Sequence, residues 1–157
     1  MNKKIISFFL LACALATKAI PMAEWTDLHE AAKRGNANVL QRLLTEGFDV
    51  DLPLYNQATA LHVASGRPKV DCISVLIQHG ANVNATRDDG MTPLHFAAFH
   101  GNFEGVQKLV KHGAKIYAHT KKDKTTPVML AAKRGYHGIV HYLVEQGSRT
   151  HHKKAKT

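Results

Sequence analysis

A seven-residue motif that recurs at a fixed interval constrains the fold of this chain more than any other feature of its sequence. The clearest copy is Thr-Pro-Leu-His-Phe-Ala-Ala at residues 92–98. Two features recur every 33 residues. One is the motif histidine, at His29, His62 and His95, and the other is a glycine that ends an aliphatic run, at Gly47, Gly80 and Gly113. A fourth copy follows with one residue inserted, at Thr126-Pro127 and Gly147. The chain is therefore built from internal repeats, each of which buries its apolar face against the next one.

The period and the motif together resemble the ankyrin repeat, in which two antiparallel helices are followed by a hairpin-like loop. The resemblance covers residues 23–150 and implies an all-α solenoid of helix-turn-helix units with hairpin loops. The expected organisation is a signal peptide over 1–19, four repeats over 23–55, 56–88, 89–122 and 123–150, and a disordered basic tail over 151–157. A fold of this kind does not by itself identify a partner.

The recurring residues suit helix boundaries. Proline is tolerated in the first turn of a helix because its missing N–H would be unpaired there, and the threonine before it can accept from the free amides. The second repeat departs from the pattern, with Pro68 where the others carry Gly35, Gly101 and Gly135. Since proline cannot adopt a left-handed conformation, we expect Gly66 to end the first helix of that repeat early and the turn between the helices to be rebuilt.

Several residues that could carry chemistry are expected to be structural. By resemblance, the histidines at 29, 62 and 95 hydrogen-bond to the threonine region and to an adjoining loop, because buried polar groups are normally satisfied. Cys72 is expected to be a small buried hydrophobe instead of a reactive thiol. Trp25 is expected to cover the first end of the stack. At the other end, we expect Tyr142, Leu143 and Val144 to lack a following repeat that covers them.

The segment 1–19 has the layout of a secretory signal peptide. Met1-Asn2-Lys3-Lys4 precedes a short apolar run, and small residues suited to cleavage follow at 14–16 and 17–19. The run is too short for a stable membrane anchor. We expect an exported protein, periplasmic or secreted by a bacterium. A lipoprotein cleaved at Cys13 is a less favoured alternative, because the residues after Cys13 are apolar, and an uncleaved apolar cap on the stack is another.

The formal net charge of +9 arises entirely from the C-terminal third. Residues 1–110 contain ten basic and ten acidic side chains, whereas 111–157 contain eleven basic side chains against Asp123 and Glu145, which leaves +9. We expect an acidic protein partner for a monomeric, non-enzymatic module. The alternative is charge-driven binding of a polyanion, namely an acidic lipid, an envelope polymer or nucleic acid. Nucleic acid is less favoured because an exported protein seldom meets it.

No catalytic residue set is expected. The segment 29–33 comes within one residue of the zinc-protease motif, but Lys33 occupies the position of the second histidine. His137 and His141, with Glu145 one turn further, are weak candidates for a metal site, since surface histidines lack partners that orient them. The sequence contains no phosphate-cradling glycine loop and no nucleophile with a base and an acid. We therefore expect no metal, no cofactor, no small-molecule substrate and no enzyme activity.

The resemblance implies that a partner docks on the concave face, formed by the hairpin tips and the exposed sides of the first helices. We expect the following residues to contact it: Tyr55, Arg87, Met91, Phe96, Phe99, His100, Lys33, Arg34, Leu130, Lys133 and Arg134. The same register adds Gln57, Asp88, Lys122 and Lys124 at the tips and Glu30, Val63 and Arg67 on the helices. Phe96 and Phe99 are the expected anchors, because exposed aromatics near arginine are typical hot spots. Their alternative role is partial burial between repeats.

Overall fold

The structure is a computed structural model, and it describes residues 27–154, with side chains up to residue 148. The expected signal peptide over 1–19, the alternative at Cys13 and the expected capping role of Trp25 therefore lie outside the described residues.

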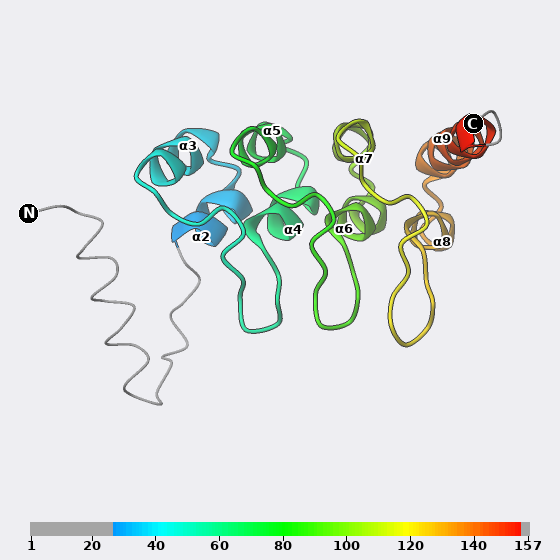
Figure 1. Cartoon of the computed structure of the whole chain (residues 1–157), viewed down its shortest axis with the longest axis horizontal. Coiled ribbons are helices and arrows are strands. Elements are labelled where there is room, and N and C mark those ends of the chain that lie inside the picture. The colour runs from blue at the N-terminus through cyan, green and yellow to red at the C-terminus, as the bar shows by residue number, and fades with distance from the viewer. Residues whose placement is uncertain (1–26, 155–157) are drawn as a thin grey trace, which may run out of the picture.

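The described residues form eight helices arranged in four pairs. The pairs are α2 (Asp27–Arg34) with α3 (Ala37–Thr45), α4 (Ala60–Ser65) with α5 (Asp71–Gln78), α6 (Pro93–His100) with α7 (Phe103–Lys111), and α8 (Pro127–Lys133) with α9 (His137–Lys154). The first members of the pairs, called the inner helices here, stand side by side in one row, and the second members, the outer helices, form a parallel row (Figure 1). No strand occurs within residues 27–154. The expected all-α solenoid of helix-turn-helix units is confirmed.

Three long connections link each outer helix to the next inner helix. They are called the first, second and third finger loops, and they comprise residues 46–59, 79–92 and 112–126. All three project on the same side of the inner row (Figure 1). The third loop is one residue longer. Lys124 has a φ of 51°, and the equivalent residues of the other two loops, Gln57 and Gly90, also have positive φ, so this left-handed position two residues before the capping threonine recurs in all three loops.

The turn between the paired helices is built in two ways. Gly35, Gly101 and Gly135 have φ values of 70°, 74° and 77°, which is the left-handed conformation expected of them. Gly66 instead has φ −79°, and α4 ends before it at Ser65, so the prediction of an early helix end is confirmed. The rebuilt turn is held by the next repeat, because the Asn102 side chain donates to the carbonyl oxygens of Ser65 at 3.0 Å and Arg67 at 2.6 Å.

The outer helices end as expected in three repeats and differently in the fourth. Gly47, Gly80 and Gly113 have φ values of 97°, 85° and 88° and turn the chain out of the helix. Gly147 lies inside α9, which continues to Lys154, so residues 151–154 are helical where a disordered tail is expected. The sequence offers a reason. Three residues after the first three glycines stands an aliphatic side chain, Val50, Val83 or Ile116, that anchors the returning chain, whereas Thr150 stands there in the fourth repeat.

The core lies between the two rows of helices. Equivalent leucines of the inner helices, such as Leu61 and Leu94, are fully buried, and alanines such as Ala64 and Ala97 let neighbouring inner helices approach closely. The expectation that the fourth repeat leaves its outer helix uncovered is correct for Val144, which is 55% exposed, and wrong for Leu143, which is 1% exposed. Leu143 faces back into the core, whereas Val144 points away from it.

The helices of residues 27–154 are not suited to crossing a membrane. None of them combines the length and the apolar composition that a membrane span requires.

Candidate interaction surface

The motif histidines are buried inside the stack and take no part in its surface. His62 Nε2 lies 3.1 Å from the Met91 carbonyl oxygen, and His95 Nε2 lies 3.1 Å from that of Thr125. The backbone N–H of Thr92 donates to His95 Nδ1 at 3.1 Å, so Nδ1 is unprotonated and the proton is on Nε2. The rings of His62 and His95 therefore tie their own helix starts to the loop of the next repeat, and His29 Nε2 lies 3.3 Å from the Ala58 carbonyl oxygen of the next repeat. The structural role expected from the sequence is confirmed.

Burial favours the neutral form of these rings. It lowers the pKa of His62 from 6.5 to about 4, although the hydrogen bond to Met91 opposes the shift. Burial likewise lowers the pKa of His29 and of His95. Burial raises the pKa of the Cys72 thiol, which is fully buried, so this cysteine is the inert hydrophobe that the sequence predicts.

The fourth repeat carries Met129 at the histidine position, and its side chain is 56% exposed. No further repeat follows it in the described part of the chain, so no loop carbonyl would be available to a histidine there. Met129 still engages the helix start, because Thr126 N–H points to its sulfur at 3.4 Å. Methionine therefore replaces histidine at the one motif position where the described residues provide no loop carbonyl to accept a hydrogen bond.

Phe96 and Phe99 form the aromatic centre of the face made by the inner helices and finger loops, called the inner face here. Both rings are half-buried, which combines the expected exposure with the alternative of partial burial. The guanidinium carbon of Arg134 lies 3.8 Å from the Phe99 ring centroid, and that of Arg87 lies 5.3 Å from the Phe96 centroid. His100 packs between the two rings, edge-on to Phe99 at 5.0 Å. Each ring thus has an arginine on its face.

The guanidinium group of Arg87, in the second finger loop, is only partly hydrogen-bonded. Its Nη2 lies 3.2 Å from a carboxylate oxygen of Asp89, while its buried Nε has no hydrogen-bond partner among the described residues. A donor in this condition carries a desolvation cost that an added acceptor would relieve.

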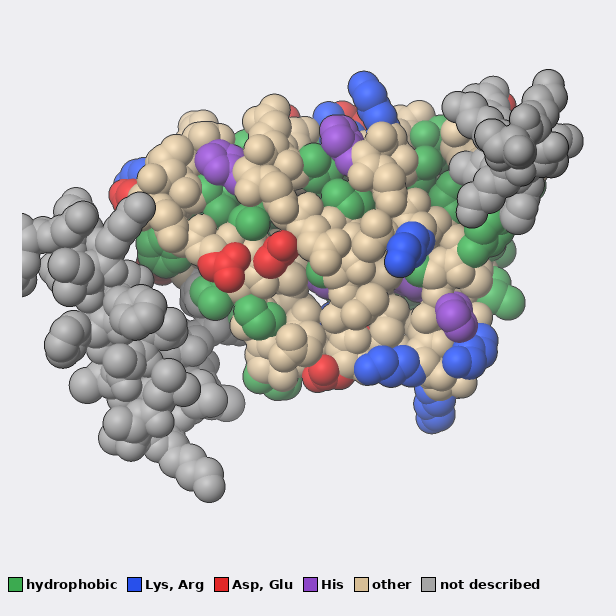
Figure 2. Space-filling model, viewed as in Figure 1, with side chains coloured by type: hydrophobic (Ala, Val, Ile, Leu, Met, Phe, Trp, Pro, Cys, Tyr) green, Lys and Arg blue, Asp and Glu red, His purple; other side chains and the backbone are tan. Residues whose placement is uncertain are grey.

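The cations of the inner face differ in how far they are neutralised. Arg34 Nε donates to Glu30 at 2.7 Å, and Lys33 Nζ lies 3.8 Å from the same carboxylate. The hydrogen bond from Arg34, helped by Lys33, lowers the pKa of Glu30. At the other end of the described stack, no ion pair involves Lys133 or Arg134, nor the third-loop lysines, Lys121, Lys122 and Lys124. Lys and Arg side chains gather over that loop (Figure 2).

Ten of the eleven predicted contact residues lie on inner helices or finger loops, and Arg134 lies directly after α8. Tyr55 is 95% exposed in the first loop, and His100, Lys133 and Arg134 are exposed at the ends of α6 and α8. Met91 and Leu130 are half-buried. Sequence reasoning missed exposed apolar side chains outside this set, at Phe48, Phe103, Tyr117 and Met129. Met129 is exposed because no repeat follows it among the described residues, and the period of the repeats could have indicated that.

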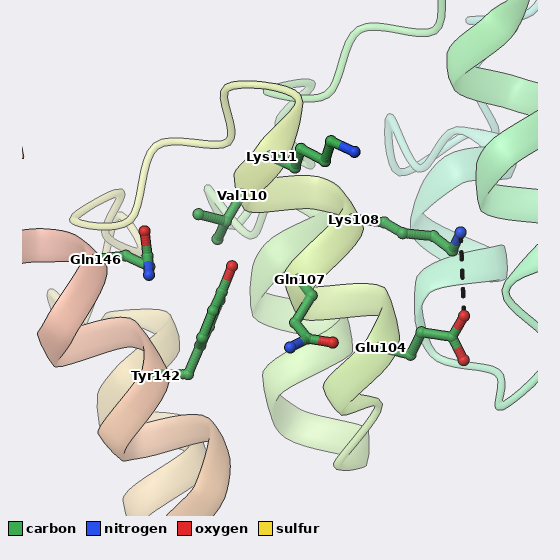
Figure 3. A pocket seen from close by; sticks show the side chains of 7 residues that line it. All are labelled: Glu104, Gln107, Lys108, Val110, Lys111, Tyr142 and Gln146. Atoms are coloured by element: carbon green, nitrogen blue, oxygen red, sulfur yellow. Dashed lines mark ion pairs between the residues drawn. The ribbon is translucent and has the colours of Figure 1, made fainter.

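Two of the open hollows of the described surface adjoin α9 or the third finger loop. One, of about 460 Å³, lies between α7 and α9, where the Tyr142 ring points toward Val110 and Gln107 (Figure 3). Its charged rim carries the Glu104 and Lys108 pair at 4.0 Å. The other, of about 830 Å³, lies along the third finger loop beside Tyr117.

The predicted metal candidates do not form a ligand cluster. His137 and His141 are exposed on the first turns of α9, and no three His, Cys, Asp or Glu side chains of the described residues are placed to hold an ion. Asn84 links the second finger loop to the third, since its Oδ1 accepts from Lys115 N–H at 2.8 Å and its Nδ2 donates to the Gly113 carbonyl at 3.0 Å.

These features define a repeat scaffold whose exposed inner face varies while its buried positions recur. The family model for ankyrin repeats in three copies matches residues 28–120, and the model for a single ankyrin repeat matches residues 123–154. The chain belongs to the ankyrin repeat family. Ankyrin repeats are protein-protein interaction modules and are generally non-enzymatic. No curated protein matches the chain in sequence.

Proposed function

We propose that the chain is an exported interaction module that binds an acidic protein partner on its inner face. The observation that carries this proposal is the contact of Arg134 with Phe99, at 3.8 Å. It places a cation with no ion-pair partner among the described residues directly on a half-buried aromatic ring. Aromatic and arginine side chains in such clusters dominate binding energies at protein interfaces. Lys133 beside Arg134 and the third-loop lysines favour an acidic partner.

The test places a photoreactive benzoylphenylalanine at position 99 and, as a matched control, at position 103. Phe103 is also aromatic and 42% exposed, but it lies at the start of α7, an outer helix. A partner on the inner face should be cross-linked from position 99 and not from 103, and the cross-linked segment should be acidic. Cross-linking from 103 alone would refute the proposal.

The competing function is charge-driven binding of a polyanion through the basic C-terminal third. It is favoured by the unpaired lysines of the third loop and by the continuation of α9 to Lys154. Binding of this kind weakens steeply with salt, because each neutralised phosphate releases counterions. Deleting residues 151–157 should then flatten the salt dependence, whereas the Phe96→Ala, Phe99→Ala double variant should leave it unchanged. The opposite pattern supports the protein partner.

Export is proposed from the amino-terminal segment alone, with its Lys3-Lys4 start and apolar run. The mass of the protein recovered from its own cells, measured with fractionation, tests it. A chain that begins near Thr17 or Ile20 in the exported fraction supports export. An intact Met1 in the cytoplasm refutes it.

A further inference from the structure

Four side chains at equivalent positions of the four repeats form what is called here the cationic row: Arg34, Arg67, His100 and Arg134. Successive members follow one another at the interval of the repeat, with the insertion of the third finger loop falling before the last one. Each stands at or just beyond the carboxyl end of an inner helix, and all four side chains are exposed. The row therefore crosses the inner face from one end of the described stack to the other.

The turns that carry neighbouring members of the row touch one another. A Cβ placed at Gly35 would lie 2.7 Å from the Lys69 side chain, one at Gly66 would lie 3.1 Å from the His100 ring, and one at Gly101 would lie 2.7 Å from the Tyr136 ring. The turns that carry successive members are thus one helix spacing apart, which is about 8 to 10 Å for helices in contact.

Three members of the row are held in place by the stack itself. The carbonyl of Arg67 accepts from Asn102 at 2.6 Å, the His100 ring donates through Nδ1 to the Phe96 carbonyl at 2.9 Å, and Arg134 rests on Phe99. Side chains and turns fixed in advance lose less entropy when a ligand binds.

Favourable interaction with the helix dipole explains why a cation stands at the carboxyl end of an inner helix. The helix dipole does not explain why such a cation would have no ion-pair partner. Among the described residues only Arg34 of the row has an ion pair, with Glu30 of its own helix. Arg67, His100 and Arg134 have none. Arg67 and Arg134 are therefore free to meet carboxylates from outside, and the His100 ring between them does so only in its protonated form.

We propose that the cationic row binds an extended acidic peptide segment of the partner, with a carboxylate at every third residue. An extended chain advances about 3.3 to 3.6 Å per residue, so three residues span about 10 Å, which matches the spacing of adjacent inner helices. A row one side chain wide suits a single extended strand, and the arginine fork suits carboxylate oxygens. This inference rests on the proposed function, in which the partner docks on the inner face.

The experiment uses the purified chain and two labelled synthetic peptides of identical composition. One is Glu-Ser-Gly repeated four times, and its isomer places the four glutamates together. Fluorescence anisotropy at fixed ionic strength gives the two dissociation constants. We expect the spaced peptide to bind about tenfold more tightly, since it reaches members of the row that the clustered peptide does not reach.

A pair of double variants separates position from net charge. Arg67→Glu with Arg134→Glu changes the row, whereas Arg42→Glu with Lys111→Glu makes the same change of charge on outer helices α3 and α7. The row variant should weaken the spaced peptide about tenfold or more relative to the outer-helix variant. Arg67→Gln with Arg134→Gln repeats the comparison without added repulsion. Helical circular dichroism confirms that each variant is folded.

Equal binding of the two peptides, or an equal loss in both double variants, overturns the proposal. If duplex DNA or polyphosphate binds as tightly as the spaced peptide, and the same variants lose this binding, the row binds a polyanion and the proposal is overturned. These outcomes are distinct from failure of the proposed function. Cross-linking from position 99 with no preference for the spaced peptide leaves the proposed function intact. If the spaced peptide is preferred and that preference depends on the row, but nothing is cross-linked at position 99, the proposed function fails and only peptide binding by the row is supported.

Discussion

Acid should weaken the fold through His62, whose ring is fully buried between the second and third repeats. Its Nδ1 accepts from the Thr59 N–H at 3.1 Å, and its Nε2 donates to the Met91 carbonyl. A proton added to Nδ1 would face an N–H donor and would bring an uncompensated charge into the core. Protonation therefore requires the second repeat to open.

The magnitude follows from the shift in pKa. His62 has a pKa of about 4 in the folded chain against 6.5 when unfolded. The unfolded chain binds the proton first as the pH falls, so the stabilisation is complete above 6.5 and is lost between 6.5 and about 4. Between about pH 7.5 and about pH 5 the loss amounts to about 2 kcal/mol, which would shift a urea midpoint by about 1 M.

Urea unfolding followed by circular dichroism at the two pH values measures this loss. His62→Gln is the informative variant, because glutamine suits the third position of a capped helix and does not titrate. Its midpoint should change with pH by about 1 M less than that of the unaltered chain. Contributions of His29, His95 and Glu30 are present in both proteins and cancel in the difference. His112→Gln, at the exposed end of α7, controls for the loss of any histidine.

The reasoning would be refuted if His62→Gln lost as much stability in acid as the unaltered chain. That result would mean that the buried ring accepts a proton in place, or that opening at other sites governs the acid response.

Further predictions concern single side chains that the stack either tolerates or requires, and chemical denaturation checks each of them. Gly138→Ala should stabilise the chain by about 0.5 to 1 kcal/mol, since the position is helical and exposed and no atom outside its own helix lies near the new Cβ. Gly147→Ala, in the same helix, should destabilise it, because the new Cβ would clash with the Tyr117 hydroxyl; a gain equal to that of Gly138→Ala would show that α9 does not pack there. Asn102→Ala should cost about 2 to 4 kcal/mol, because it removes the cap of α7 and leaves two carbonyls of the preceding turn without their donor; a cost below about 0.5 kcal/mol would mean that water replaces these bonds.

The sequence predicted the elements of this fold because the signals for them are local. A threonine before a helix, a glycine after it and a histidine at its third residue act within one turn, so they can be read without knowing the neighbours. The early end of α4 at Gly66 was predictable for the same reason, since Pro68 excludes the usual turn wherever the repeat is placed.

The sequence predicted which face carries the site, but it did not predict how the side chains of that face contact one another. Register alone assigns Phe96 and Phe99 to the inner face, and both lie there. Their half-burial and the arginines on their rings depend on side chains from the neighbouring repeats, Arg87 and Arg134, whose rotamers no local signal specifies. The sequence likewise shows that the four members of the cationic row occupy equivalent positions of the repeats. Their alignment as a row depends on the stacking of adjacent turns.

The repeat, the boundaries of the helices other than the end of α9, and the structural histidines follow from the sequence alone, because each depends on interactions within about one helical turn or on a period that recurs. The burial of individual side chains at the fourth repeat and the end of α9 follow from the tertiary structure. Leu143 is buried because it faces back to the core, Met129 is exposed because no described repeat covers it, and α9 continues through Gly147 because no aliphatic anchor follows. Burial is a property of the whole stack, and it is set by which surfaces meet.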